Sequence, residues 1–417
     1  MLLIMTLVGA LCVSAAIQTG KSRAKTRTSL ALESVFAEYD TDLLAQYHLF
    51  AYDAGRGGQE AETGVCMRIH SYGGDPELTV DKIQYLSDRS GEAIVEQAGR
   101  YMESRNMISA LYGDSQSVRD SYAQEIGEQL LAHANDGLSA EIAGDILSLL
   151  ALPVAQTALP RGRAVSGGRI DLGSSPSHRD LRKGRGAFKT DGGARYFDEY
   201  LMEVCDNAAE EQSLKEPAYE AEYVIAGKAA DKDNLEAVVT RILAIRMAVN
   251  MSHLHQDAAK QAEIESIAAF LSLAAAVPAA QPAIKEALAA AWAYAESMAE
   301  IRALLAGKRV ATVKNAQNWK VGAAGILHLN RSMEEGWETD DQEGGISYED
   351  YLRGFLFPIP VGKKAMRLAD LIEININRAR GGSDFLVDRA VCRLQTAGVC
   401  RLERGVTFQY KNIFVYR

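Results

Sequence analysis

A phosphate-binding loop is the most explicit chemical pattern in the sequence. The stretch AAIQTGKS, residues 15–22, satisfies a relaxed nucleotide-binding pattern in which Lys21 would reach the phosphates and Ser22 would hold Mg²⁺. Ala15 replaces the first glycine, so the backbone lacks the freedom that a phosphate cradle requires. The apolar run before it is also too long for one strand. We therefore expect a chance match, and an enzyme that hydrolyses nucleotides with Lys21 is the least favoured function.

The other residues that could do chemistry lack the required spacing. His253 and His255 are two residues apart, so on a helix they point to different faces, whereas helical metal sites usually use an i, i+4 pair. Neighbouring carboxylates occur at Glu33 and Glu38, Glu263 and Glu265, and Asp340 and Asp341. Acid–base catalysis needs two carboxyl groups whose surroundings separate their pKa values, and no such separation can be read from these pairs. We expect no catalytic residue, no cofactor and no metal site.

The five cysteines do not form a dense disulfide framework. Cys392 and Cys400 flank the stretch VCRLQTAGVCR, which could be a hairpin, so a disulfide between them is geometrically conceivable. Buried free thiols are the alternative.

Composition describes an ordinary folded protein rather than a disordered one. The chain has 417 residues, of which 47% are hydrophobic and 24% are charged, and its net charge is −10. Nucleic-acid binding needs a basic surface, so we expect no nucleic-acid partner.

The N-terminal segment is apolar and uncharged. Residues 1–19, MLLIMTLVGALCVSAAIQT, are long enough to span a hydrocarbon core of about 30 Å as a helix. A cleaved signal peptide is the competing interpretation, since CVSAA offers small residues near a cleavage point. The bases follow the apolar run, at Lys21, Arg23, Lys25 and Arg27, which favours a cytoplasmic position for the rest of the chain. Either this rule is overridden or Met1 is not the true start.

Beyond these bases, the apolar residues continue at helical spacing. No glycine or proline occurs between Lys21 and Asp53, so we expect the helix to continue to about residue 47. The predicted packing face of this amphipathic part consists of Leu32, Phe36, Tyr39, Leu43 and Tyr47.

The rest of the chain alternates between helical and extended patterns. Residues 64–91 indicate strands around a Gly-Gly-Asp-Pro turn, and residues 385–417 indicate two or three further strands. Between them, long Ala-rich amphipathic segments predict a helical bundle, with Gly307 ending one helix. Residues 160–195 are rich in Gly, Ser and Arg and indicate a flexible loop.

These patterns predict six segments and one fold class. The segments are residues 1–20 (hydrophobic, transmembrane, pilin-like helix), 21–53 (its amphipathic continuation), 54–159 (first part of an α+β head), 160–195 (flexible loop), 196–330 (helical bundle) and 331–417 (a helix and the C-terminal strands that complete the head). The predicted fold is α+β and mainly helical. It has a long N-terminal helix, a small antiparallel sheet from N- and C-terminal strands, and an inserted helical bundle.

Four stretches together resemble a known family. They are LALESVFAEYDTDLLAQYHLFAYD (30–53), EYVIAGKAADKDNLEAVVTRILAIRMAVNMSHL (222–254), AWAYAESMAEIRALLAGKRV (291–310) and ISYEDYLRGFLF (346–357). With the apolar helix before them, they resemble an uncharacterised family of Gram-positive surface proteins. That family is associated with tight-adherence (Flp-type) pilus loci and is similar to minor pseudopilins. Pilin-like segments usually carry a glutamate a few positions into the apolar helix, and residues 1–17 contain no acidic residue.

The resemblance implies a non-enzymatic structural or assembly protein of a pilus system. It implies a single-pass attachment to the cell membrane by the N-terminal helix and an extracytoplasmic head. The expected partners are the lipid bilayer and pilus subunits or assembly proteins. The alternative is a binding module, in which the bundle or the basic residues 160–195 capture an anionic envelope polymer or a host ligand.

Overall fold

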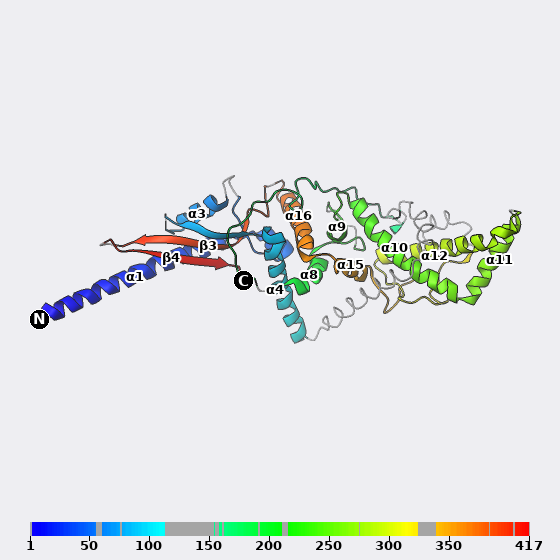
Figure 1. Cartoon of the computed structure of the whole chain (residues 1–417), viewed down its shortest axis with the longest axis horizontal. Coiled ribbons are helices and arrows are strands. Elements are labelled where there is room, and N and C mark those ends of the chain that lie inside the picture. Colours follow the sequence, from blue (N-terminus) through cyan, green and yellow to red (C-terminus); the bar gives the residue numbers. More distant parts are fainter. Residues whose placement is uncertain are drawn as a thin grey trace. The chain divides into compact units, whose positions relative to one another are not determined.

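The structure is a computed structural model. It describes residues 2–55, 61–75, 77–112, 154, 158–160, 162–190, 192–210, 216–274, 276–323, 339–382, 384–402 and 405–416. Figure 1 shows the order of the elements along the chain. The helices are α1 (Leu2–Phe36), α2 (Thr41–Tyr47), α3 (Ala61–Ser71), α4 (Asp88–Tyr112), α8 (Phe197–Val204), α9 (Glu220–Ala226), α10 (Asp231–Gln256), α11 (Ala258–Ala274), α12 (Gln281–Leu305), α15 (Tyr348–Leu356) and α16 (Val361–Ala379), with 3-10 turns η1 (Ala194–Tyr196) and η2 (Pro278–Ala280). The strands are β1 (Tyr52–Asp53), β2 (Thr79–Tyr85), β3 (Ala390–Arg401) and β4 (Thr407–Val415).

The chain divides into two compact units. The first consists of Met1–Arg105, Leu172–Tyr200 and Pro360–Arg417, and the second consists of Asn106–Asp171 and Leu201–Ile359. The predicted fold class is therefore confirmed: the protein is mainly helical α+β, with a long N-terminal helix and a sheet built from both ends of the chain. Of the predicted first head segment, residues 113–153 lie outside the described part of the chain.

The first unit is organised around strand β3. β2 pairs with one edge of β3, and β1 and β4 pair with the other edge, all antiparallel. Leu394 of β3 therefore lies between Ile83 of β2 and Phe414 of β4. Because β2 comes early in the sequence and β3 and β4 come last, the sheet joins the N-terminal and C-terminal segments of the first unit.

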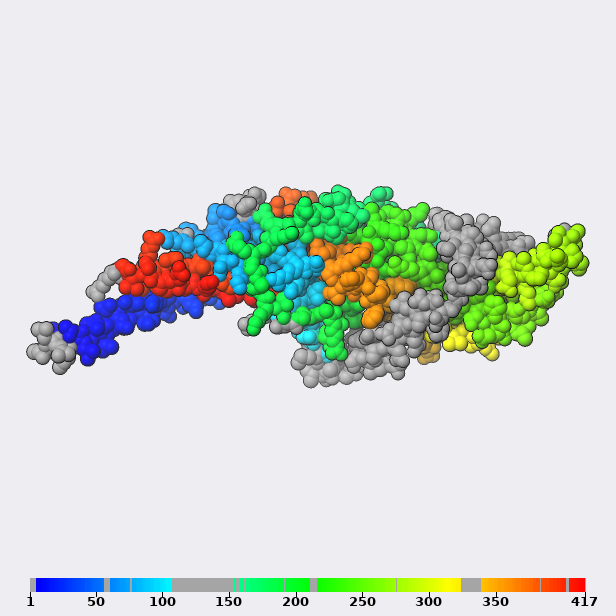
Figure 2. All heavy atoms as spheres, viewed as in Figure 1, coloured from blue at the N-terminus to red at the C-terminus, as the bar shows by residue number. Residues whose placement is uncertain are grey.

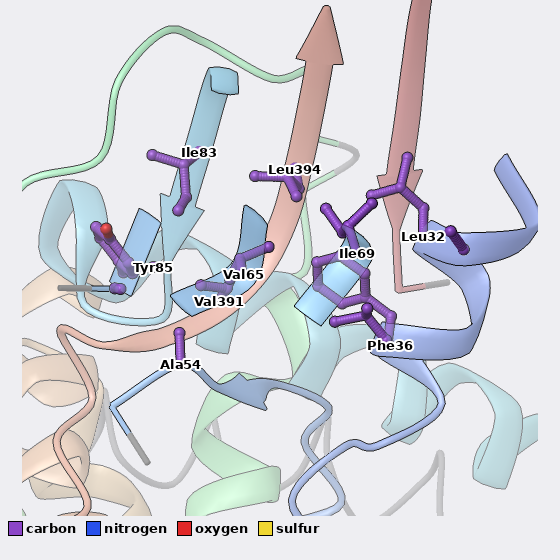
Figure 3. Close-up of a cluster of buried hydrophobic side chains, with 12 residues drawn as sticks. Leu32, Phe36, Ala54, Val65, Ile69, Ile83, Tyr85, Val391 and Leu394 are labelled. Atoms are coloured by element: carbon purple, nitrogen blue, oxygen red, sulfur yellow. The ribbon is translucent and has the colours of Figure 1, made fainter. Parts of the chain in front are cut away.

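The second half of α1 forms the core of this unit together with the sheet and α3. Ala31, Leu32, Val35 and Phe36 lie on one helix face and are buried against Val65 and Ile69 of α3 and against the sheet (Figure 3). The Phe36 ring stacks on the Phe414 ring with centroids 4.2 Å apart. Burying one such side chain contributes about 1.5–3 kcal/mol, so this face fixes the helix to the head.

The prediction that one helix continues to residue 47 is wrong. α1 ends at Phe36, and α2 begins at Thr41 after the N-cap residue Asp40. The Asp40 carboxylate accepts a hydrogen bond from the Leu43 amide at 3.0 Å. Arg380, the C-cap residue of α16, bonds to both Asp40 and Asp42 at 2.6 Å. In a continuous helix, the Leu43 amide would donate to a backbone carbonyl of the same helix. Here it donates to the Asp40 side chain, so a new helix begins after Asp40.

The prediction of strands throughout residues 64–91 is only partly right. The second half is strand β2, but the first half belongs to helix α3. Ala61, Val65 and Ile69 repeat every four residues and are fully buried, which is the spacing of one helix face rather than of a strand. The helical period therefore determines the local structure here.

The second unit contains the predicted helical bundle, inserted between Tyr200 and Pro360 of the first unit. Helices α10, α11 and α12 pack together, and the Trp292 indole donates a hydrogen bond to the Val321 carbonyl at 2.7 Å. The predicted helix end at Gly307 is confirmed: this residue has φ +81°, and the amide of Lys308 bonds back to the Ala303 carbonyl at 2.9 Å.

A buried ionic network joins α10 and α12. The Arg246 guanidinium bonds to Glu300 through Nε at 2.8 Å and Nη2 at 2.6 Å, and both side chains are almost fully buried. The Lys314 ammonium lies 2.8 Å from Glu300 and 2.5 Å from Glu296. Burial alone would raise the pKa of Glu300, but the two cations lower it below its ordinary value. The carboxylate is therefore kept charged inside the bundle.

Candidate functional site

The first part of α1 presents an exposed apolar surface of the first unit. Its side chains are exposed from Met5 to Cys12, with fractions of 72% for Met5, 60% for Leu7, 53% for Val8 and 62% for Leu11. Figure 2 shows this part of the helix extending beyond the β3–β4 hairpin. Over the part of the chain that the structure describes, no helix combines the length and the apolar character needed to cross a membrane.

From Gly20 onward the same helix is held by strand β4. The Lys21 ammonium lies 5.5 Å from the centre of the Phe408 ring, and the Asn412 amide donates to the Lys25 carbonyl at 3.3 Å. Further along the helix, the hydroxyl groups of Thr28 and Tyr410 lie 2.9 Å apart. α1 therefore has two parts with different surroundings, an exposed apolar part and a part docked along the sheet.

The five residues of the predicted packing face lie on three elements. Leu32 and Phe36 are in the α1 core, Leu43 and Tyr47 are buried on α2, and Tyr39 lies between the helices with its ring edge on Phe50. Their environment is the head of the same chain. The earlier part of α1 is more exposed than these five residues, and the periodicity of residues 32–47 does not indicate it.

Tyr47 is the most firmly held of these five residues. The Asn375 amide donates to its hydroxyl at 2.7 Å, and the Tyr200 hydroxyl donates to its carbonyl at 2.5 Å. Both partners are distant in sequence, so α2 is a point where three segments of the first unit meet.

The two cysteines considered for a disulfide lie on one strand. Cys392 and Cys400 both belong to β3, and both are free thiols. Eight residues of extended chain separate them by about 26 Å, far beyond the roughly 7 Å that a disulfide allows between its Cα atoms. The hairpin prediction for VCRLQTAGVCR is wrong, because the strand continues to Arg401 before the chain turns.

The nucleotide-binding pattern is part of a continuous helix. Residues 15–22 lie inside α1, where backbone amides bond to helix carbonyls and cannot also cradle phosphate. His253 lies 3.5 Å from Asp257, whereas His255 lies 3.9 Å from Glu286. Among the described residues, no group of three or more His, Cys, Asp or Glu side chains is placed to hold a metal ion.

One member of each carboxylate pair singled out by the sequence forms an ion pair. Glu38 pairs with Arg68, Glu265 with Lys285 and Asp340 with Lys320. These partners explain the carboxylates as surface ion pairs, which contribute little to stability.

The basic segment, residues 172–190, is held by ion pairs and hydrogen bonds that the spacing of residues in the sequence does not predict. Arg179 donates to both oxygens of Glu373 at 2.7 Å and to Asp388 at 2.9 Å. Asp388 also accepts from the Arg182 amide at 3.0 Å. Burial raises the pKa of Glu373, and the Arg179 guanidinium opposes this shift. These bonds tie the segment to α16 and to the chain just before β3.

The same segment closes a cleft in the first unit. The cleft has a volume of about 550 Å³ and lies between the segment, the end of β2, the start of α4 and α16. In the described part of the chain, the cationic side chains that line it are those of Arg89, Arg182 and Lys183. The sequence signal for it was the basic composition of residues 160–195, but the contribution of Arg89 required the fold.

Comparison with the curated proteins and with the solved structures finds no match. A family model does match residues 135–402, which is more than half of the chain. This stretch covers the bundle, α16 and the whole of β3. The chain belongs to a family of unknown function (DUF5702).

Proposed function

We propose that this chain is a membrane-attached, pseudopilin-like structural or assembly subunit of a tight-adherence type pilus system, without catalytic activity. The first part of α1 is the attachment helix, and the bulk of the chain lies outside the cytoplasm. The partners are lipid and other pilus subunits or assembly proteins.

The exposed apolar part of α1 is the observation that carries this proposal. Met5, Leu7, Val8 and Leu11 are more than half exposed in the chain by itself. Contiguous apolar surface of this kind usually marks a contact with a membrane or a protein. Each such side chain gains about 1.5–3 kcal/mol when it is fully buried, so a few of them can hold the helix in an apolar environment.

The charges after this part favour lipid as the first partner. Residues 2–20 carry no charge, and Lys21, Arg23, Lys25 and Arg27 follow immediately. Basic residues beside an apolar helix bind anionic headgroups, each with about 1 kcal/mol. The helix therefore offers an apolar part for the acyl region and a cationic part for the surface.

The division of α1 supports a pilin-like role. A helix whose second part is fixed to the head can present its exposed apolar first part to lipid or to neighbouring subunits. α1 has the same division, with docking from Gly20 to Phe36. The resemblance of four stretches of the sequence to proteins of pilus loci points to the same role.

Vesicle flotation of the full chain tests the attachment. We expect the chain to float with vesicles that contain phosphatidylglycerol, and the double variant Leu7→Asp, Leu11→Asp to remain in the lower fractions. Leu30→Asp is the matched control, because Leu30 is 58% exposed on the docked part of the same helix. Equal flotation of all three proteins, or no flotation of the unchanged chain, would overturn the proposal.

Photo-crosslinking in cells tests the assembly role. A photoreactive residue at position 11 should crosslink to a second copy or to another subunit with an apolar N-terminal helix, whereas the same residue at position 30 should not. External protease should digest the head on intact cells. A protected head, or crosslinks to cytosolic proteins, would count against the proposal.

A further inference from the structure

The cleft of the first unit has the size and the rigidity of a binding site. Its volume of about 550 Å³ falls within the ordinary range for small-molecule sites, roughly 300–1,000 Å³. Its walls come from the Ser87–Ser90 turn, the Pro176–Gly186 segment and Met366 of α16. All three belong to the same compact unit.

One wall is a strained turn. Arg89, Ser90 and Gly91 have φ of 51°, 59° and 78°, so three consecutive residues are left-handed. A non-glycine residue in this region costs on the order of 1–3 kcal/mol, and such residues cluster at functional sites. Helix α16 holds the turn closely, since a Cβ on Gly91 would lie 2.8 Å from the Ala365 side chain.

Asp88 joins this turn to the opposite wall. Its carboxylate accepts hydrogen bonds from the Tyr85 amide at 2.7 Å and the Gly184 amide at 2.8 Å. Ile83 and Arg185 add two backbone bonds beside it, at 3.0 and 2.9 Å. Gly184 approaches so closely that a Cβ there would lie 2.2 Å from the Asp88 carboxylate. Among the described residues that line the cleft, Asp88 carries the one carboxylate, and its hydrogen bonds fix the two walls to each other.

The remaining charges are positive and come from two walls. Arg89 lies on the turn, and Arg182 and Lys183 lie on the segment. Arg89 also reaches Glu92 at 3.1 Å, a partly exposed pair that contributes little by itself. A ligand with negative charge would meet cations on two sides.

Two buried polar atoms complete the site. Ser87 and Gln84 line the cleft and are each 4% exposed, yet among the described residues the Ser87 hydroxyl and the Gln84 side-chain oxygen have no hydrogen-bond partner. A buried polar group without a partner costs about 1–3 kcal/mol. A ligand with hydroxyl groups or several oxygens would remove this cost.

We propose that this cleft binds a phosphate group, held by Arg89, Arg182 and Lys183, with Ser87 and Gln84 as hydrogen-bonding partners. A carboxylate is planar and is satisfied by one bidentate arginine, whereas a phosphate offers oxygens in several directions to separate cations. The site goes beyond the attachment role of α1 and exists whether or not α1 enters a membrane.

Isothermal titration of the full chain with inorganic phosphate and with glycerol 3-phosphate, at low salt, tests this site. We expect saturable binding that Lys183→Gln weakens about fivefold or more, as loss of a charged hydrogen-bond donor predicts. Lys189→Gln is the matched control: it removes the same charge from an exposed position six residues along the same segment, outside the cleft lining. Ser87→Ala should weaken binding without lowering the melting temperature, because it deletes an unpaired hydroxyl.

Three results would overturn the site: no saturable binding of either probe, equal weakening by Lys183→Gln and Lys189→Gln, or unchanged binding by Ser87→Ala and Lys183→Gln. A glycerol phosphate oligomer separates the two sources of the group. Tighter binding of the oligomer than of glycerol 3-phosphate, lost in Lys183→Gln, assigns the cleft to an envelope polymer. Equal binding assigns it to a free phosphate ester.

Discussion

The hydroxyl groups of Thr28 and Tyr410 lie 2.9 Å apart and join the first helix of the chain to its last strand. Tyr410 in turn donates to the Asp75 carboxylate at 2.8 Å, so the three side chains form one chain of hydrogen bonds. Thr28 is 1% exposed, and water cannot replace Tyr410 as its partner.

Removal of the tyrosine hydroxyl should therefore weaken the docking of α1. We expect Tyr410→Phe to lower the free energy of unfolding of the first unit by about 1–3 kcal/mol, because the Thr28 hydroxyl is left buried without an acceptor. The double variant Thr28→Val, Tyr410→Phe should recover most of the loss. Chemical unfolding monitored by circular dichroism measures this, and equal stability of the single and double variants would contradict it.

Arg179 should be essential for holding the basic segment against the rest of the first unit. Arg179→Ala leaves the buried carboxylates of Glu373 and Asp388 without their cation, and loss of one partner of a buried pair costs about 3–5 kcal/mol. Arg179→Lys should recover only part of this, because lysine cannot bond to both carboxylates as a fork. Hydrogen exchange should show faster opening of residues 174–186 in both variants, and unchanged exchange there would argue against the anchor.

The pair of Arg246 and Glu300 should behave differently when one or both members are removed. Arg246→Met leaves Glu300 buried with Lys314 as a cation and Asn250 as a neutral donor, and we expect a loss of roughly 3 kcal/mol or more. The double variant Arg246→Met, Glu300→Met should be more stable than the single variant, because no uncompensated carboxylate remains beside Lys314. A double-mutant cycle of thermal unfolding checks this, and strict additivity of the two losses would exclude the coupling.

The buried carboxyl group of Glu222 should make the free energy of unfolding depend on pH. Burial raises the pKa of Glu222 to about 7 from an ordinary value of 4.5. The Tyr348 hydroxyl at 2.7 Å and the Ala208 amide at 2.9 Å both donate to Oε1, and these bonds oppose the shift only in part. Among the described residues, Oε2 has no partner. Between pH 4.5 and about 7 the folded state binds more protons than the unfolded state. This group therefore lowers stability as pH rises through that window, by up to about 3 kcal/mol.

Glu222→Gln should remove this contribution, so the variant gains stability relative to the unchanged chain as pH rises from about 5 to about 8. Glu265→Gln is the control, since the pKa of Glu265 is lowered, chiefly by hydrogen bonding to Lys285, and it stays ionised in this range. Urea unfolding at several pH values measures the difference. Parallel pH profiles for the unchanged chain and Glu222→Gln would show that the carboxyl does not titrate as expected.

The cysteines should differ in their rate of labelling by a thiol reagent, according to their exposure. Cys12 is exposed, whereas Cys205 and Cys392 are buried, and burial raises the pKa of Cys392 to about 12. Because the thiolate is the reactive form, we expect rapid maleimide labelling of Cys12 and labelling of Cys205 and Cys392 only in urea. Mass spectrometry should also find no mass deficit from a disulfide between Cys392 and Cys400, and such a deficit would refute the strand geometry.

Local patterns predicted much of the fold. The first helix, the bundle helices and the C-terminal strands depend on periodicities that each segment carries by itself, and Gly307 ends its helix by its own conformation. The end of α1 was also signalled locally, because Asp40 is a good N-cap residue, but the apolar spacing on both sides concealed it. The continuity of β3 through Cys392 and Cys400 depends on β2 and β4, which lie far away in sequence.

The candidate sites were predictable to different degrees. The apolar first part of α1 is visible as an uncharged run, and only its exposure required the structure. The cleft combines residues 84–90 with residues 176–186 and Met366, and no pattern in one segment can indicate the others. The same holds for Arg179, whose carboxylate partners are 194 and 209 residues away.

The sequence separation of 382 between Thr28 and Tyr410 has a consequence for synthesis. The apolar face of α1 that ends at Phe36 leaves the ribosome long before β4, its partner in the core, has been made. During that interval Leu32, Val35 and Phe36 are uncovered, and nascent chains with uncovered apolar surface are prone to aggregate. The core of the first unit can therefore be completed only after the last strand has been made and has docked on α1.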